Sequence, residues 1–142
     1  MSQAREFSIV LSHNAEAKTQ AAAALYRYNV EAVGMGDRTP IGAELRDASG
    51  RALGGLWGRT ELGLLFLDMF FVPGHLRGRL HGTQLLALVE GEARRRGCRR
   101  AVVETSSFQA PGFYSSHGYE EFGRVEFAVE GQARIFLRKR LE

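Results

Sequence analysis

The segment from Val72 to Gly82 contains the residues whose types and spacing most clearly indicate chemistry. It reads Val-Pro-Gly-His-Leu-Arg-Gly-Arg-Leu-His-Gly, between an apolar segment and a predicted helix. A short loop between a strand and a helix directs backbone N–H groups and the positive end of the helix dipole at one point, which makes an anion site. Arg77 and Arg79 add positive charge, and Gly78 and Gly82 let a ligand approach the backbone closely. The segment suits a pyrophosphate; the alternative is an ordinary turn.

Other candidate nucleophiles and metal ligands carry weaker signals. The four histidines show no regular ligand spacing: His13, His75, His81 and His117. With a single cysteine to help them, a metal site is not expected. Cys98 lies just before a predicted strand and is expected to be a small packed residue rather than a nucleophile. Ser106 and Ser107 lack a Gly-x-Ser-x-Gly pattern, which disfavours a serine hydrolase.

The elements that must position the anion segment follow from hydrophobic periodicity and turn residues. Predicted strands cover about residues 7–11, 41–47, 51–59, 64–72, 100–105, 119–129 and 132–139. Predicted helices cover about residues 15–33, 83–96 and 110–117. Residues 64–72 are apolar on both faces, as in a central strand, and Gly54 with Gly55 indicates a bulge or a close backbone approach. This order predicts a mixed α/β sheet with helices on its faces.

Length and composition indicate one domain over residues 1–142. Hydrophobic residues make up 44% of the chain and charged residues 25%, which is typical of a globular protein. No linker, repeat or low-complexity stretch divides the sequence. The first residues lack the apolar region of a signal peptide, and the longest apolar run, residues 62–73, is too short to cross a bilayer. A cytoplasmic location is therefore the expectation.

The net charge of +3 comes largely from arginine. The basic residues form two groups: Arg94, Arg95, Arg96, Arg99 and Arg100, and then Arg134, Arg138, Lys139 and Arg140. Such clusters can mark a nucleic-acid surface. No recognised nucleic-acid-binding module accompanies them, however, and arginines at helix ends also suit the helix dipole. A solvated surface is the favoured interpretation, and a basic balance also suits a partner with several phosphates.

Two sequence blocks resemble the GNAT acetyltransferases. The acetyl-CoA loop of that family typically reads Arg-Gly-x-Gly-x-Gly/Ala after Val-x-Pro, and residues 77–82 read Arg-Gly-Arg-Leu-His-Gly. Residues 113–119 read Phe-Tyr-Ser-Ser-His-Gly-Tyr, similar to the family's Phe-Tyr-x-x-x-Gly-Phe/Tyr. Residues 54–58 and 105–110 also resemble a subgroup of small stand-alone bacterial GNAT proteins. The resemblance covers about residues 41–123.

The resemblance implies a GNAT fold: α/β, with a mixed central sheet of about six to seven strands, splayed at the cofactor site and flanked by helices on both faces. The residues implied to bind acetyl-CoA, the acetyl donor, are Phe70, Phe71, Val72, Leu76, Arg77, Gly78, Arg79, Leu80, His81, Gly82, Thr83, Ser107 and Ala110. Backbone N–H groups from Leu76 to Thr83 would bind the pyrophosphate, and Phe70 and Val72 would pair with the pantetheine amides as an added strand does. The family usually has glycine at Leu80, where a side chain can crowd the pyrophosphate or weaken the N–H cradle.

Three side chains are candidates for acid–base chemistry. Tyr114 matches the family tyrosine that protonates the departing thiolate, and a phenol with a pKa of about 10 suits that task. The alternative is a packed aromatic. An amine acceptor must also lose a proton. Either of two carboxylates can act as the base or hold the ammonium group: Asp68, which is predicted to share a face with Phe66 and Phe70, or Glu104 on the neighbouring strand. Alternatively, Asp68 bonds nearby backbone and Glu104 pairs with an arginine.

The resemblance therefore predicts an acyl-CoA-dependent N-acyltransferase. It would move an acetyl group from acetyl-CoA to a primary amine of a small molecule or peptide by direct attack in a ternary complex. A second interpretation is a catalytically inactive GNAT-fold module that binds CoA as a sensor or partner. Selectivity in this fold lies in the first helix, the loop at residues 34–39 and the last hairpin, where no motif identifies the acceptor. A homodimer is expected from the resemblance alone; nucleic acid and membrane are not expected partners.

Overall fold

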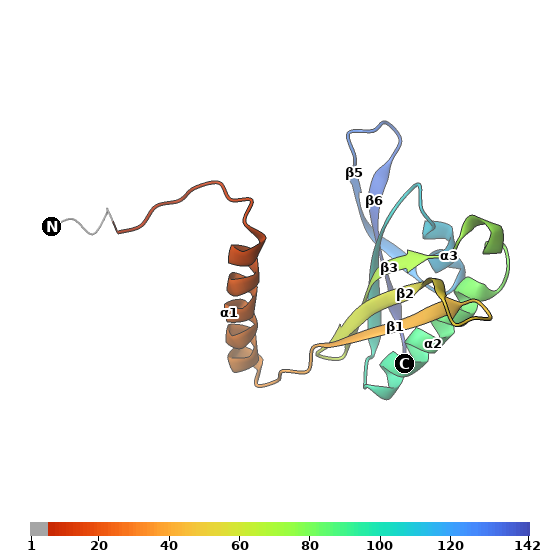
Figure 1. Cartoon of the computed structure of the whole chain (residues 1–142), viewed down its shortest axis with the longest axis horizontal. Coiled ribbons are helices and arrows are strands. Elements are labelled where there is room, and N and C mark those ends of the chain that lie inside the picture. Colours follow the sequence, from red (N-terminus) through yellow and green to blue (C-terminus); the bar gives the residue numbers. More distant parts are fainter. Residues whose placement is uncertain (1–5) are drawn as a thin grey trace. The chain divides into compact units, whose positions relative to one another are not determined.

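A computed structural model of the protein describes residues 6–142, and the chain forms two compact units, Met1–Gly36 and Asp37–Glu142 (Figure 1). The first unit contains helix α1 (Ala15–Val33). The Asn14 side chain caps it by accepting from the N–H groups of Glu16 and Ala17, and Gly34 ends it with φ +73°. The strand predicted at residues 7–11 is wrong, because this segment has no regular structure and pairs with no strand of the described chain.

The second unit is built on a six-stranded sheet in the order β1-β2-β3-β4-β6-β5 (Figure 1). The strands are β1 (Thr39–Arg46), β2 (Ala52–Glu61), β3 (Leu64–Phe71), β4 (Arg100–Ser106), β5 (Glu120–Glu126) and β6 (Ala133–Arg140). Neighbouring strands are antiparallel except β3 and β4, which are parallel. The predicted mixed α/β sheet is confirmed.

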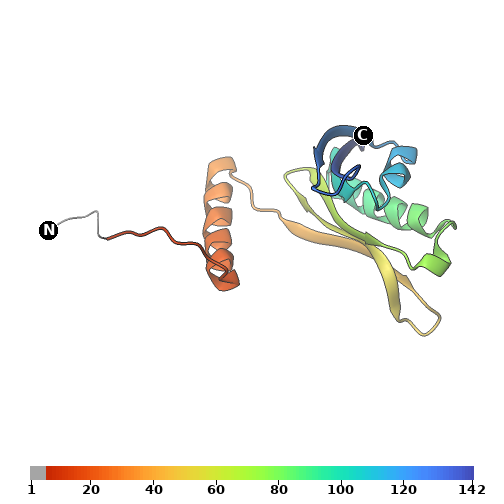
Figure 2. The same ribbon diagram turned by 90° about the horizontal axis from the view of Figure 1, so that it is seen from above.

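Two helices and a 3-10 turn complete this unit: η2 (Gly74–Leu76), α2 (His81–Arg95) and α3 (Pro111–Ser116). Helix α2 packs against β1 and β2 (Figure 2). Its apolar stripe of Leu85, Leu86, Val89 and Ala93 is buried. No helix within residues 6–142 is long and apolar enough to span a membrane.

Glycines in β2 bring neighbouring strands unusually close. A Cβ atom on Gly54 would overlap the carbonyl oxygen of Phe71, and one on Gly55 would overlap that of Ala43. The predicted close backbone approach at this glycine pair is therefore confirmed. Gly58 has the same property against the Phe66 carbonyl oxygen of β3.

A bulge at Asp68 changes which face each residue of β3 occupies. Trp57 pairs with Met69 and the next residue, Gly58, pairs with Leu67, so Asp68 is the extra residue. Phe66 and Asp68 both contact Arg59: the guanidinium lies 4.2 Å from the Phe66 ring centroid and 3.9 Å from the Asp68 carboxylate. Beyond the bulge, Phe70 joins the hydrophobic core. The prediction that Asp68 shares a face with Phe70 is wrong, since it assumed uninterrupted alternation.

Candidate functional site

The parallel strands β3 and β4 separate halfway along their length. Their pairing runs from Leu64 with Arg100 to Leu67 with Val103 and stops there, although β3 continues to Phe71 and β4 to Ser106. The last residues of β3 therefore have a free backbone edge toward β4. A free edge of this kind can pair with an extended ligand.

The loop after β3 folds back on the end of that strand. Arg77 donates from Nε to the Val72 carbonyl oxygen at 2.8 Å, and its guanidinium carbon lies 5.9 Å from the Phe71 ring centroid. Gly78 follows with φ +76°, a conformation that favours glycine. This fold-back keeps a positive charge beside the turn that leads into α2.

The N-terminus of α2 is open to an anion. Leu80 occupies the N-cap position with no side-chain cap, and the first turn contains no acidic residue. The first N–H groups of a helix have no partner within the helix, so those of His81, Gly82 and Thr83 are available to a ligand. The Leu80 side chain is 70% exposed and its φ of −83° is ordinary for any L-residue, so leucine imposes no backbone strain here.

Gly82 also has a packing role. A Cβ atom there would lie 3.0 Å from Phe113 and 3.1 Å from Phe70. These two rings stack with centroids 4.9 Å apart. The glycine therefore lets the first turn of α2 sit directly on the aromatic pair that joins β3 to α3.

Tyr114 of α3 borders the gap between the separated strands. Its ring lies 6.1 Å from that of Phe70, which belongs to the free part of β3, and 5.3 Å from that of Phe113. The residue is 2% exposed, and this burial raises the pKa of the Tyr114 phenol. Within residues 6–142 its hydroxyl makes no hydrogen bond, and no fully buried polar side-chain atom there lacks a partner. The ring is therefore buried, and its hydroxyl is not held by another group of the described chain.

Asp68 and Glu104 lie at the point where the strands separate. Each follows directly after the last paired residue of its strand, and each faces away from the buried side chains of Leu67 and Val103. The Asp68 side chain is 57% exposed, with its only ion pair in the described chain at 3.9 Å. The Glu104 side chain is 50% exposed, and its carboxylate accepts a hydrogen bond from Arg134 Nε at 2.6 Å. The two carboxylates thus share one face, and the interpretation that Glu104 pairs with an arginine is confirmed.

Ser107 and Ala110 connect β4 to α3. The Ser107 hydroxyl donates to the Gln132 side chain at 2.6 Å and accepts from the Ala133 N–H at 2.9 Å. Ala110 is the N-cap of α3. Hydrogen bonds to the chain thus occupy the Ser107 hydroxyl, and the implied contacts of both residues with acetyl-CoA stay predictions.

A buried charged cluster was missed by sequence reasoning. The carboxylate of Glu90, 5% exposed, accepts from the Tyr119 hydroxyl at 2.7 Å and from Lys139 Nζ at 2.9 and 3.1 Å. Burial, followed by this hydrogen bond, raises the pKa of Tyr119. A glutamate on the apolar stripe of α2, one residue after Val89, was the available signal.

His117 was also missed as a partner of the anion segment. Its ring bridges Thr83 in the first turn of α2 and the Phe113 carbonyl of α3. By contrast, Cys98 is buried, and this burial raises the pKa of its thiol, as suits a packed residue.

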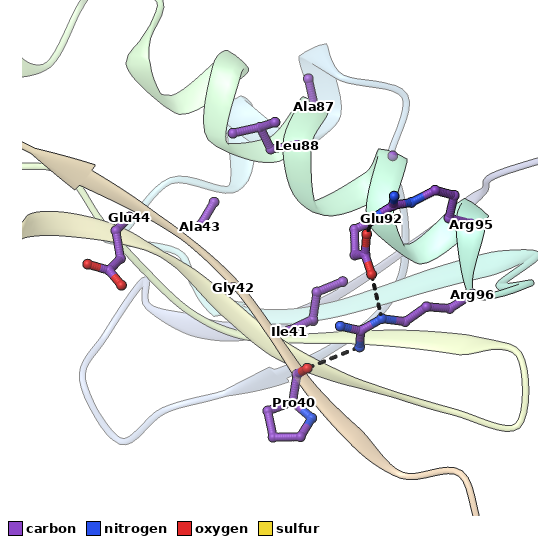
Figure 3. Close-up of a pocket in the computed structure, with 11 residues that line it drawn as sticks. Pro40, Ile41, Gly42, Ala43, Glu44, Ala87, Leu88, Glu92, Arg95 and Arg96 are labelled. Atoms are coloured by element: carbon purple, nitrogen blue, oxygen red, sulfur yellow. Dashed lines mark hydrogen bonds and ion pairs between the residues drawn. The ribbon is translucent and has the colours of Figure 1, made fainter.

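A groove of about 630 Å³ lies between β1 and α2, away from all of these residues (Figure 3). Ile41, Ala43 and Leu88 form its apolar part, and Arg96 closes one end by donating to the Pro40 carbonyl at 3.0 Å. None of the residues implied to bind acetyl-CoA or to act as acid or base lines this groove. The candidate site is therefore the open end of the sheet, not this groove.

Comparisons with known proteins identify the family of the chain. Residues 11–119 match the acetyltransferase (GNAT) family. An acetyltransferase of Agrobacterium fabrum is 33% identical over 135 residues, covering 94% of this chain and 98% of the relative. The crystal structure of an acetyltransferase from Bacillus cereus superposes with a TM-score of 0.80 at 28% identity, covering 94% of this chain and 97% of that one. A blasticidin-S acetyltransferase of Streptomyces morookaense is 42% identical over 71 residues, 49% of this chain and 52% of the relative. The chain belongs to the GNAT family of acyl-CoA-dependent N-acetyltransferases.

Proposed function

We propose that the protein transfers an acetyl group from acetyl-CoA to a primary amine of a small molecule or peptide, by direct attack in a ternary complex. The observation that carries this proposal is the end of β3–β4 pairing at Leu67 and Val103. Beside that opening lie an anion-binding helix end and a buried tyrosine with a free hydroxyl. The resemblance to GNAT enzymes implies these three features in one place.

The residues at this opening fit the chemical groups of acetyl-CoA. The backbone N–H groups from Gly78 to Thr83 would bind the pyrophosphate, helped by the charges of Arg77 and Arg79. The N–H groups of Leu76 and Arg77, also expected there, instead donate to the carbonyl oxygens of Pro73 and Gly74. The free edge of β3 would pair with the amides of the pantetheine chain. The donor would then lie with its thioester near Tyr114.

Acetyl transfer at this site requires the acceptor nitrogen to lose protons and the departing sulfur to gain one. An acceptor that arrives as an ammonium ion loses one proton before it attacks and a second, to water, as the amide forms. The amine lone pair attacks the thioester carbonyl carbon, the carbon–sulfur bond breaks, and an amide forms. Tyr114 would donate its phenolic proton to the departing sulfur and later recover one from water. Its raised pKa keeps this proton in place, and a thiolate in the same dry surroundings is more basic as well.

We assign to Asp68, rather than to Glu104, the role of the base that removes a proton from the acceptor amine. The Asp68 carboxylate has a single, long ion pair with Arg59, whereas Glu104 is held by a short hydrogen bond from Arg134. A carboxylate free of close partners can hold an ammonium group and pass its proton to water. The acceptor is thus expected to arrive as a cation on the face that carries Asp68. The named substrate of the Streptomyces relative, blasticidin S, makes aminated small molecules a reasonable first panel.

The first test is thermal unfolding with and without acetyl-CoA, followed by measurement of CoA release with a panel of amines. A ligand at 100 times its dissociation constant stabilises by about 2.7 kcal/mol, or roughly 5 °C for a domain of this size. Replacing Tyr114 with Phe should lower kcat about 100-fold and leave the thermal shift unchanged. A shift without turnover for any amine would favour the binding-module interpretation, and no shift would remove the donor site.

A further inference from the structure

The contact between Thr83 and His117 joins the anion-binding end of α2 to helix α3. Thr83 Oγ1 lies 2.9 Å from His117 Nε2, although the residues are 34 positions apart in the chain. His117 Nδ1 lies 2.8 Å from the Phe113 carbonyl oxygen and 3.2 Å from Ser116 Oγ. The imidazole packs on the Phe113 ring, with centroids 4.5 Å apart. Both ring nitrogens are therefore engaged and the ring cannot turn freely.

The chemistry of these partners determines where the hydrogens lie. A carbonyl oxygen only accepts, so His117 Nδ1 carries a hydrogen and donates it to Phe113. In the neutral ring Nε2 then has a lone pair and accepts from the Thr83 hydroxyl. In that state the Thr83 hydrogen points at His117 and is not available to a ligand.

A phosphate near the helix end would favour the opposite arrangement. Phosphate oxygens accept hydrogen bonds and attract positive charge. When the ring gains a second proton, on Nε2, this N–H donates to Thr83 Oγ1. The Thr83 hydroxyl can then turn its own hydrogen toward the phosphate. The same proton gives the His117 ring a positive charge, with only the Thr83 side chain between it and the phosphate.

Positive groups around His117 keep its ring neutral until an anion binds. They are the N-terminus of α2, Arg77 and Arg79 in the loop before it, and Lys139, whose Nζ lies 3.9 Å from the Cβ position of Gly118. Helix α3 contains Tyr114 and no charged residue, and the first turn of α2 contains His81. The carboxylate of Glu90 lies further along α2 and is held by Tyr119 and Lys139. Across residues 6–142, no carboxylate forms an ion pair with His117.

We propose that His117 is a positioning residue of the acetyl-CoA site, and that binding of the pyrophosphate adds a proton to its Nε2 so that Thr83 can donate to the phosphate. This inference rests on the proposed function, since it requires the donor to bind at the α2 N-terminus. It adds a residue of the second GNAT sequence block to the phosphate end of the site, where only the glycine loop and the first turn of α2 were expected.

Titration calorimetry with acetyl-CoA at pH 8, in two buffers of different ionisation enthalpy, measures the number of protons that the protein takes up on binding. At this pH the phosphates of the ligand are ionised, since their last pKa is about 6. We expect a net uptake of protons by the wild type and by the control His13→Gln, whose histidine is exposed before α1 and makes no hydrogen bond in the described chain. His117→Gln should bind without uptake, because an amide can donate from nitrogen while staying neutral. Equal uptake by His117→Gln and wild type, or none in the wild type, would overturn the proposal.

A comparison of two donors separates positioning from a merely structural role. Acetyl-pantetheine has the thioester but no pyrophosphate. We expect His117→Leu to raise the KM for acetyl-CoA about tenfold and to leave the KM for acetyl-pantetheine nearly unchanged. Thr83→Val should have the same effect on both KM values, and the double variant should raise the KM for acetyl-CoA no further than either single variant. Equal losses with both donors would mean that His117 only supports the fold. If the wild type fails to bind acetyl-CoA at all, it is the proposed function that fails.

Discussion

Tyr114 and Tyr119 come from the same sequence block but have different surroundings. Burial raises the pKa of both phenols. The Tyr119 hydroxyl donates to the carboxylate of Glu90, whereas that of Tyr114 has no partner within residues 6–142. A phenol that already donates to a buried carboxylate cannot readily give its proton to a substrate. This difference makes Tyr114 the candidate acid and Tyr119 a part of the core.

Replacing Tyr119 with Phe should lower the free energy of unfolding by about 1–3 kcal/mol, because Glu90 loses a buried donor. Equilibrium unfolding in urea at pH 7 measures this. The pH dependence has a definite sign: the folded pKa is above the unfolded value, so the contribution to stability is complete below about pH 10 and is lost as the pH rises above it. The variant should therefore lose less stability than the wild type between pH 7 and 10.5. An unchanged stability at pH 7 would contradict the role of this hydrogen bond.

Leu80 is the position where the anion loop departs from the GNAT pattern. We expect Leu80→Gly to change the dissociation constant of acetyl-CoA by no more than about threefold, because φ is −83° and the helix begins at the same place with either residue. Thermal midpoints over a range of acetyl-CoA concentrations measure the constant. Much tighter binding by the variant would instead support the expectation that the leucine side chain crowds the pyrophosphate.

At the level of elements, the gap in the sheet depends on β2 and β3 together. Close approach at Gly58 accompanies the bulge at Asp68, and pairing between β3 and β4 stops one residue before that bulge. A bulge bends its strand and increases the local twist. The end of β3 is thereby turned away from β4, which leaves the edge that the pantetheine chain would use.

Gly58→Ala should lower the free energy of unfolding by about 1–3 kcal/mol, since its Cβ would overlap the backbone of β3. Gly91→Ala is the matched control: that glycine lies inside α2 with no atom near its Cβ position, so alanine should stabilise by about 0.5–1 kcal/mol. Urea unfolding of both variants measures the two effects. Equal and small changes would argue against the close contact between the strands.

Across the whole molecule, most of the clustered positive charge is locally compensated. Arg94 pairs with Glu90, Arg95 and Arg96 with Glu92, Arg100 and Arg140 with Glu142, Arg134 with Glu104, and Arg138 with Glu120. Exposed pairs of this kind contribute little stability, but they reduce the field that a polyanion meets.

We therefore expect no retardation of random double-stranded DNA in a gel-shift assay at about 0.1 M salt. Non-specific DNA binding needs several uncompensated cations, and its affinity falls steeply with salt concentration. A retarded band that weakens as salt is added would contradict this and favour the nucleic-acid interpretation of the arginine clusters.

Much of the fold could be predicted because it depends on local sequence. The strand predicted at residues 64–72 is Leu64–Phe71, and the helix predicted at residues 83–96 is His81–Arg95, because long apolar or periodic runs carry their own signal. The two GNAT blocks likewise placed the anion loop and Tyr114 from a few adjacent residues. The strand predicted at residues 7–11 was wrong, since a short weak pattern becomes a strand only with a neighbour to pair with.

The remaining features depended on contacts between distant residues. The facing of Asp68 followed from the pairing of β3 with β2, and the bulge that set it is a property of two strands. The clusters at Glu90 and His117 join elements separated by 49 and 34 positions in the chain. Neighbouring residues indicate what a segment is, but the partner of a buried polar group depends on which elements pack together. Tertiary packing therefore determines which tyrosine hydroxyl lacks a partner and which histidine contacts the N-terminus of α2.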